Sequence, residues 1–202
     1  GGRLEEAVEI ANFFLPRGKV IVTTKGKTKQ ASNTYKTLRE PLDLDIPITV
    51  LVNGATASAS EILSGAFEDF DRAVIVGSRT FGKGVVQTTR PLPYGGVMKL
   101  TTSKYYIPSG RCVQAIDYKH RNEDGSVGTI PDSLTTVFHT AAGREVRDGG
   151  GVMPDIEVKQ EKLPNILFYL VRDNLIFDYA TQYCLKHPSI PSPQEFKVTD
   201  AD

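Results

Sequence analysis

Residues 48–84 read ITVLVNGATASASEILSGAFEDFDRAVIVGSRTFGKG, and they predict a strand, a helix and a second strand in succession. The runs at 48–52 and 73–76 are continuous and apolar, which is typical of strands covered on both faces. Residues 57–70 between them include the helix-favouring residues Ala, Glu and Leu and predict a helix. Because such a crossover brings both strands to the same edge of the sheet, we expect Lys83 to face the residues that start the helix.

The segment 77–84 resembles a phosphate-binding loop at first sight, because it fits all but the last position of G-x-x-x-x-G-K-[ST]. A phosphate-binding loop needs Ser or Thr after its lysine, and it opens a helix whose N-terminus holds the phosphates. Here Gly84 follows the lysine, and the next residues, VVQTTRPLP, predict a strand. The sequence therefore argues against nucleotide binding and leaves Lys83 available for another role.

The start of the predicted helix, residues 54–61, is made of small and hydroxyl-bearing residues, GATASASE. Ser58 and Glu61 fit a helix capping box, which is the commonest role of such a serine, and a lysine in a glycine-rich loop is most often a solvated charge. Their pairing favours a second interpretation, since a lysine that has lost its proton can accept one from a serine. The helix N-terminus would also supply N–H groups to a developing oxyanion.

Composition narrows the classes of function. The chain has 202 residues, with 24 acidic and 24 basic side chains, and this balance argues against nucleic acid or an anionic membrane as the main partner. No apolar run approaches the roughly 18 residues needed to span a bilayer, and the start does not read as a signal peptide. We expect no metal site, since no spacing fits one; the residues concerned are His120, His139, His187, Cys112 and Cys184. We expect both cysteines to be buried thiols, with a disulfide as the less favoured alternative.

Hydrophobic spacing predicts the remaining elements. We expect helices at 4–15 and 165–186, strands at 19–24, 85–90 and 97–107, a loop or hairpin at 25–45, and polar loops at 117–132. The inward positions expected in the last helix are Ile166, Leu167, Leu170, Leu175, Ile176, Tyr179 and Tyr183. The tail from His187 onward is rich in Pro and Ser and is expected to be poorly ordered.

The string TASASE at 56–61, followed by FGKG at 81–84 and then Gln87, resembles the C-terminal processing, or tail-specific, serine proteases. Three further blocks resemble that family, GGRLEEAVEIANFFLPRGKVIV, TTSKYYIPSGRCVQ and GREVRDGGGVMPDIEV. The resemblance implies an α/β fold with a crotonase/Clp-protease-like core of β-β-α units. It implies a peptidase core at 1–160, truncated at its N-terminal edge, and a C-terminal helical segment and tail at 161–202. Nothing in the chain corresponds to a PDZ domain, so one is expected upstream in the parent protein.

The resemblance also implies roles for individual residues. The nucleophile falls on Ser58, and the general base falls on Lys83, twenty-five positions later. Gln87 matches a residue that orients the lysine, and the oxyanion would be held by the backbone amides of Gly2 and Ala59. Because Gly2 lies at the free end of the chain, the resemblance leaves open whether this chain is active alone.

The reaction implied is attack of a serine hydroxyl on a peptide carbonyl, followed by hydrolysis of an acyl-enzyme, without metal or cofactor. The substrate would be a polypeptide cut near its C-terminus and laid along a sheet edge. Glu61 and Asp69 are expected to be structural. The resemblance implies a location in the bacterial cell envelope or periplasm, and the oligomeric state is open, a homo-oligomer included.

Two rival functions remain in view, a non-catalytic peptide-tail-binding module of the same fold and an acyl-CoA enzyme. The intact set of Ser58, Lys83 and Gln87 argues against the first. The lack of a recognisable CoA-binding surface argues against the second.

Overall fold

The computed structural model describes residues 1–159 and 164–197. The chain forms two compact units, Gly1–Lys159 and Gln160–Asp202, close to the expected division after residue 160. Each unit is described by itself below. No helix within the described residues is long and apolar enough to cross a membrane.

The first unit mixes helices and strands, which confirms the α/β class. Its helices are α1 (Leu4–Phe14) and α2 (Ala59–Asp69). Its strands are β1 (Val20–Gly26), β2 (Asn33–Lys36), β3 (Thr49–Val52), β4 (Val74–Gly77), β5 (Val85–Pro91), β6 (Val97–Tyr106), β7 (Ile116–Arg121), β8 (Val127–Thr129), β9 (Val137–His139), β10 (Glu145–Arg147) and β11 (Ile156–Glu157). Short 3₁₀ turns occur at Lys29–Ala31, Pro93–Gly95 and Asp132–Leu134.

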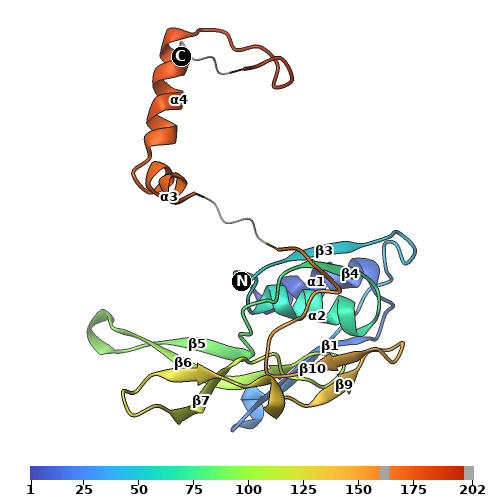
Figure 1. Ribbon diagram of the computed structural model, residues 1–202. Coiled ribbons are helices and arrows are strands. Elements are labelled where there is room, and N and C mark those ends of the chain that lie inside the picture. The colour runs from blue at the N-terminus through green and yellow to red at the C-terminus, as the bar shows by residue number, and fades with distance from the viewer. Residues whose placement is uncertain (160–163, 198–202) are drawn as a thin grey trace. The chain divides into compact units, whose positions relative to one another are not determined.

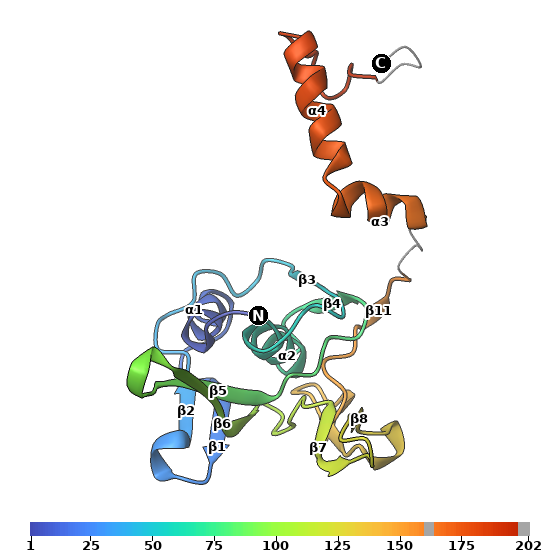
Figure 2. The same ribbon diagram turned by 90° about the vertical axis from the view of Figure 1, so that its left-hand side faces the viewer.

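Two helices lie side by side between two sheets (Figure 1 and Figure 2). The antiparallel sheet has the order β2-β1-β6-β5, and the parallel sheet has the order β11-β4-β3. Small and branched side chains fill the space between these layers, and Ala11, Ile21 and Ile75 are fully buried. Burial of such apolar surface is the main force that holds the layers together.

The predicted strand–helix–strand unit is present. β3 and β4 pair in parallel, with Val50 opposite Ile75, and α2 crosses between them. The loops that follow the two strands meet, because the Phe81 N–H donates to the Thr56 carbonyl at 2.9 Å. The prediction that Lys83 lies beside the start of the helix is therefore confirmed at the level of the backbone.

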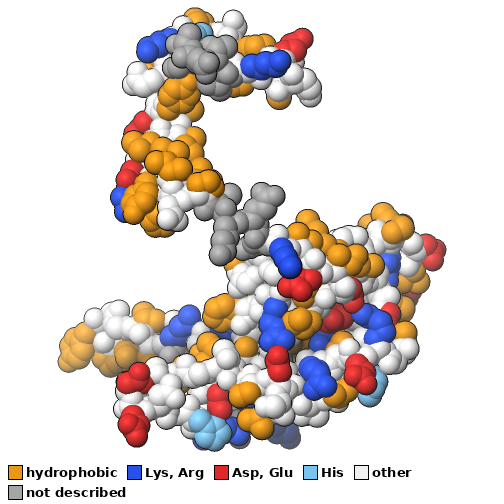
Figure 3. Space-filling model, in the orientation of Figure 1, with side chains coloured by type: hydrophobic (Ala, Val, Ile, Leu, Met, Phe, Trp, Pro, Cys, Tyr) orange, Lys and Arg blue, Asp and Glu red, His pale blue; other side chains and the backbone are white. Residues whose placement is uncertain are grey.

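The long β5–β6 hairpin projects from the body of the unit (Figure 1). Its two strands lose register between Val86 and Gln87, where β6 carries an extra residue. Hydrophobic side chains gather at its tip (Figure 3), and Leu92, Tyr94 and Val97 are exposed there. β5 is the edge strand of its sheet, so its outer backbone groups are available for pairing.

Two predictions about the first unit need correction. Strand β3 is not covered on both faces, since Leu51 is 78% exposed and α2 packs against only one side of the parallel sheet. The polar segment 117–132 is not mainly loop, because β7 and β8 pair as an antiparallel hairpin. Its polar composition reflects a two-stranded ribbon with little apolar burial, which composition alone does not separate from a loop.

The second unit corrects the prediction of one helix over 165–186. The chain forms α3 (Asn165–Arg172) and α4 (Leu175–Lys186), separated by two residues, and Asn174 adopts a left-handed conformation with φ 56°. Asparagine tolerates this conformation better than most residues. Hydrophobic side chains lie on the surface of both helices (Figure 3). The following predicted inward positions are exposed: Ile166, Leu175, Ile176 and Tyr179.

The prediction that both cysteines are buried is wrong for Cys184, which is exposed. Cys112 is half-buried, and burial raises the pKa of its thiol. Both thiols are free, so no disulfide joins them.

Candidate active site

Ser58 occupies a sharp turn between β3 and α2. It is the N-cap of the helix, as the capping interpretation predicts, but its backbone has φ 59° and ψ −120°. A residue other than glycine in this region carries about 1–3 kcal/mol of strain, and such strain is concentrated at functional sites. The small neighbours Gly54, Ala55 and Ala57 allow the turn to form tightly. The half-buried Ser58 side chain lines a cavity of about 530 Å³.

Lys83 lies in a loop that is held from two sides. The loop passes close to the segment 113–115, which Gly82, with φ 81°, and Gly84 allow because they have no side chain. There the Gly84 N–H donates to Gln114 Oε1 at 2.8 Å, and the Gly82 carbonyl accepts from the Ala115 N–H. The loop then continues directly into strand β5 and not into a helix. That arrangement agrees with the prediction that this segment does not bind nucleotide phosphates.

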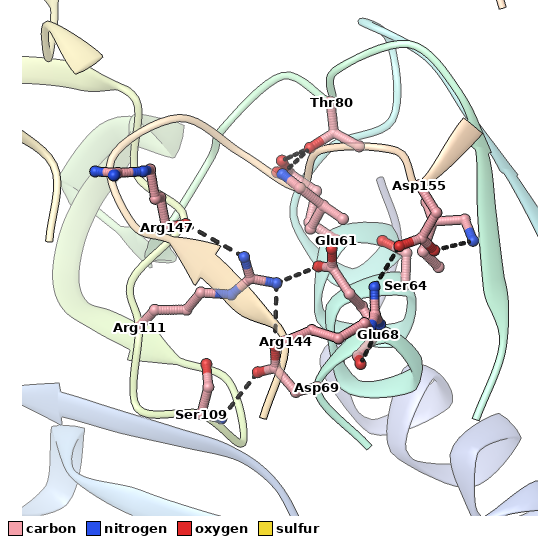
Figure 4. A network of polar contacts seen from close by, with 12 residues as sticks. Glu61, Ser64, Glu68, Asp69, Thr80, Ser109, Arg111, Arg144, Arg147 and Asp155 are labelled. Atoms are coloured by element: carbon pink, nitrogen blue, oxygen red, sulfur yellow. Dashed lines mark hydrogen bonds and ion pairs between the residues drawn. The ribbon is translucent and has the colours of Figure 1, made fainter. Parts of the chain in front are cut away.

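The fully buried Glu61 carboxylate joins the two segments, and Figure 4 shows its contact with Thr80. Its Oε2 accepts the N–H groups of Ser58 at 2.9 Å and of Lys83 at 2.8 Å. Its Oε1 accepts the Gly82 N–H at 2.7 Å and the Thr80 hydroxyl at 2.5 Å. The sequence predicted the cap but not the link to the lysine loop. The sequence carried no signal for that link beyond the capping-box position of Glu61.

Tyr105 makes a second connection between the same segments. Its hydroxyl donates to the Lys83 carbonyl at 2.5 Å and lies 3.3 Å from the Ser58 carbonyl. Burial, together with the nearby Glu61 charge, raises the pKa of this phenol well above its ordinary value. The hydroxyl therefore stays protonated and acts as a donor. Sequence reasoning missed this residue, because a tyrosine in a strand carries no local sign of its partner.

The structure brings four of the five predicted site residues to one cavity. The cavity is lined by Ser58, Lys83, Gln87 and Gly2. The fifth residue, Ala59, is buried at the first position of α2. Gly2 lies against Ala59, since a Cβ built on Gly2 would be 3.8 Å from the Ala59 Cβ.

The described residues show no hydrogen bond between the Ser58 hydroxyl and the Lys83 amino group. Catalytic hydrogen bonds in a protein without substrate are often long and shorten when substrate binds. The two residues therefore line the same cavity without a direct hydrogen bond between their side chains.

Asp69 belongs to a separate buried cluster (Figure 4). Its carboxylate lies 3.0 Å from Arg111 Nη2 and accepts the Ser109 N–H at 2.8 Å. Arg111 also contacts Glu68, and all three charged side chains are almost fully buried. Burial raises the pKa of Asp69 and of Glu68, while the Arg111 charge opposes this rise. These contacts support the expected structural role of Asp69.

Within the described ranges, no three His, Cys, Asp or Glu side chains form a cluster that could hold a metal ion. The side chains that line the cavity include the Ser58 hydroxyl, the Lys83 amine and the Gln87 amide, together with the Glu5 carboxylate and the Lys99 amine.

The sequence is similar to that of known peptidases. Residues 1–132 match peptidase family S41, and residues 166–202 match a family described as the C-terminal helical domain of a probable PDZ-protease. The chain is 44% identical over 116 residues to a carboxy-terminal-processing protease of Bartonella bacilliformis, covering 57% of this chain and 26% of that protein. It is 46% identical over 115 residues to a probable CtpA-like serine protease of Staphylococcus aureus, covering 56% and 23%.

A solved structure shows a related fold. The photosystem II D1 C-terminal processing protease superposes with a TM-score of 0.56 at 29% identity, over 81% of this chain and 33% of that one. The chain thus spans about a quarter of the length of the curated relatives that it matches.

Proposed function

Because the chain belongs to peptidase family S41, we propose that it carries the catalytic core of a serine endopeptidase that cleaves polypeptides near their C-terminus. The observation that carries this proposal is the convergence of Ser58 and Lys83 on one cavity at the N-terminus of α2. The proposed core is of the crotonase/Clp-protease type, built from β-β-α units. No metal or cofactor takes part in the proposed reaction.

Ser58 acts as the nucleophile and Lys83 as the general base. The neutral Lys83 amine takes the hydroxyl proton as Ser58 Oγ bonds to the peptide carbonyl carbon. The tetrahedral intermediate then collapses, and the leaving amine receives the proton from the Lys83 ammonium. A water molecule, deprotonated by the same amine, attacks the acyl-enzyme. The acyl bond breaks, the Lys83 ammonium returns the proton to Ser58 Oγ, and the product acid is released and ionises to a carboxylate.

Backbone amides and three neighbouring side chains supply the remaining parts of the proposed mechanism. The amides of Ala59 and Gly2 hold the oxyanion, a role supported by the closeness of Gly2 to Ala59 at the start of α2. Gln87 lines the cavity four positions after Lys83 and orients the lysine. Glu61 and Tyr105 are positioning residues, because they touch the backbone of both catalytic segments and not the reacting atoms.

The substrate polypeptide enters as an extended strand, for which the free edge of β5 offers backbone partners. From the resemblance to C-terminal processing proteases, we further propose that the parent protein carries a PDZ domain and acts in the bacterial envelope or periplasm. Homo-oligomerisation is compatible with this proposal.

Digestion of an unfolded protein, followed by mass spectrometry, tests the proposal. The chain is compared with Ser58→Ala, Lys83→Ala and Ser60→Ala, the last being a matched serine control two positions later in the first turn of α2. We expect cleavage by the parent chain and by Ser60→Ala, and none by the other two. Equal cleavage by the parent and Ser58→Ala would refute the nucleophile, and an inert parent would contradict the proposal for this chain. Peptide binding without cleavage would point to the non-catalytic module.

A further inference from the structure

A second cavity, of about 730 Å³, adjoins the active-site cavity. It lies across β1, β6 and β5 and the turn after β1. The two cavities share the lining residues Gln30, Ala31, Thr88, Thr102 and Ser103. A peptide held beside Ser58 therefore has a direct path into the second cavity.

Basic side chains line this second cavity. Lys25, Lys27, Arg90 and Lys104 are among its lining residues, no acidic residue is, and we call these four residues the basic cleft. All four are exposed, and none forms an ion pair with any other part of the described chain. Lys25 lies 4.5 Å from the centre of the Tyr106 ring, a cation–π contact that leaves its charge in place. In a chain with zero formal net charge, this is a local excess of positive charge.

Two of these charges repel each other across neighbouring strands. Lys25 of β1 and Lys104 of β6 stand directly opposite in the strand register. Like charges at opposed positions destabilise a sheet. An anion bound between them would remove that repulsion.

The border between the two cavities holds a buried polar atom without a partner. The Thr88 hydroxyl is shielded from solvent and makes no hydrogen bond within the described residues. A buried polar group without a partner is unfavourable. A polar group of a ligand that crosses this border would satisfy it.

We propose that the basic cleft binds carboxylates of the substrate polypeptide, so that preferred substrates carry acidic groups a few residues from the cleaved bond. The proposal deepens the proposed function and rests on it. Arg90 follows Thr88 by two positions, about 7 Å along the strand, which places the carboxylates within a few residues of the active-site cavity. A polypeptide fits better than a nucleic acid, because the cleft continues from the cavity that holds Ser58 and Lys83.

Binding to the Ser58→Ala chain tests this without turnover. Three labelled peptides of the same length are compared by fluorescence anisotropy. The first has Asp and Glu side chains and an amidated end, the second has Asn and Gln with a free C-terminal carboxylate, and the third has Asn and Gln with an amidated end. One partly exposed ion pair changes affinity by about two- to fivefold. With three acidic side chains, we expect about tenfold tighter binding of the first peptide than of the third at about 0.01 M salt, where the Debye length is about 30 Å.

The second peptide distinguishes side-chain carboxylates from the C-terminal one. If it binds more tightly than the third peptide, the basic cleft recognises the α-carboxylate of the tail. Equal binding of all three peptides, or no binding of the two that carry carboxylates, would overturn the proposal. Tighter binding of a single-stranded oligonucleotide than of the acidic peptide at the same salt would overturn it as well, because the cleft would then recognise polyanions in general.

A charge-removing variant ties the preference to the cleft. Lys25→Gln with Lys104→Gln is expected to abolish most of the acidic preference, and it should fold at least as well because it removes a repulsive pair. Lys119→Gln on β7, which lines neither cavity, is the matched control and should retain the preference. An unchanged preference in the double variant would refute the assignment. Cleavage by the parent chain without acidic preference would refute this inference alone, whereas acidic preference without cleavage would refute the proposed function alone.

Discussion

Glu61→Gln is expected to lower the free energy of unfolding by about 1–3 kcal/mol and to lower the proposed proteolytic activity. The substitution keeps the size and shape of the side chain but replaces one carboxylate oxygen by an amide group. Both oxygens of Glu61 accept two hydrogen bonds each, three of the four from backbone N–H groups. Glutamine can satisfy only one of these two pairs.

The magnitude follows from the donors that lose their acceptor. If the amide group replaces Oε2, the N–H groups of Ser58 and Lys83 are both left unpaired. If it replaces Oε1, the Gly82 N–H is left unpaired, and the Thr80 hydroxyl must turn to accept. Each buried donor without an acceptor costs about 1–3 kcal/mol, and a typical domain is stable by about 5–15 kcal/mol. The chain should therefore stay folded, but in either orientation the lysine loop loses a hydrogen bond to the helix that Ser58, the proposed nucleophile, caps.

Urea unfolding measures the stability, and cleavage of an unfolded protein measures the activity. The matched control is Glu123→Gln, since Glu123 is exposed in the β7–β8 turn and should change neither quantity. Unfolding within about 0.5 kcal/mol of the parent, together with full activity, would refute the view that Glu61 holds the segments of Ser58 and Lys83 together.

Three further substitutions test other contacts. Tyr105→Phe removes the hydroxyl that bridges the segments of Ser58 and Lys83. We therefore expect kcat to fall more than KM changes, and the free energy of unfolding to drop by about 1–2 kcal/mol. An unchanged kcat would contradict a positioning role. Burial raises the pKa of Glu68 against the opposing charge of Arg111, so its contribution to stability is present below its ordinary pKa and is lost as pH rises through the raised folded value. Glu68→Gln should therefore flatten the fall in unfolding free energy with rising pH, and an unchanged slope in urea unfolding would contradict this. Gly77→Ala should lower the free energy of unfolding by more than about 2 kcal/mol, because Gly77 has φ 136° and its new Cβ would lie 1.9 Å from the Val52 carbonyl oxygen of β3. Gly128→Ala, with open space around it, is the control. Equal stability of the two variants would refute the steric argument.

Local patterns in the sequence predicted most of the peptidase unit. Apolar runs predicted β3 and β4, and the spacing of small residues and of Glu61 predicted the start of α2. The crossover rule then placed Lys83 beside Ser58, although the two are far apart in the chain. These predictions succeeded because strand, helix and cap signals act over a few residues, and because parallel strands joined by a helix have few allowed arrangements.

The sequence by itself determined which residues could do the chemistry, namely a serine at a helix start and a lysine in a glycine-rich loop. Tertiary structure alone decided what holds them, because Glu61 and Tyr105 reach partners about twenty or more positions away in the chain. It also decided that Leu51 lies exposed and that Lys25 stands opposite Lys104. Hydrogen bonds and charge contacts of this kind depend on how separate elements pack, and packing is a property of the whole fold that no short stretch of sequence contains.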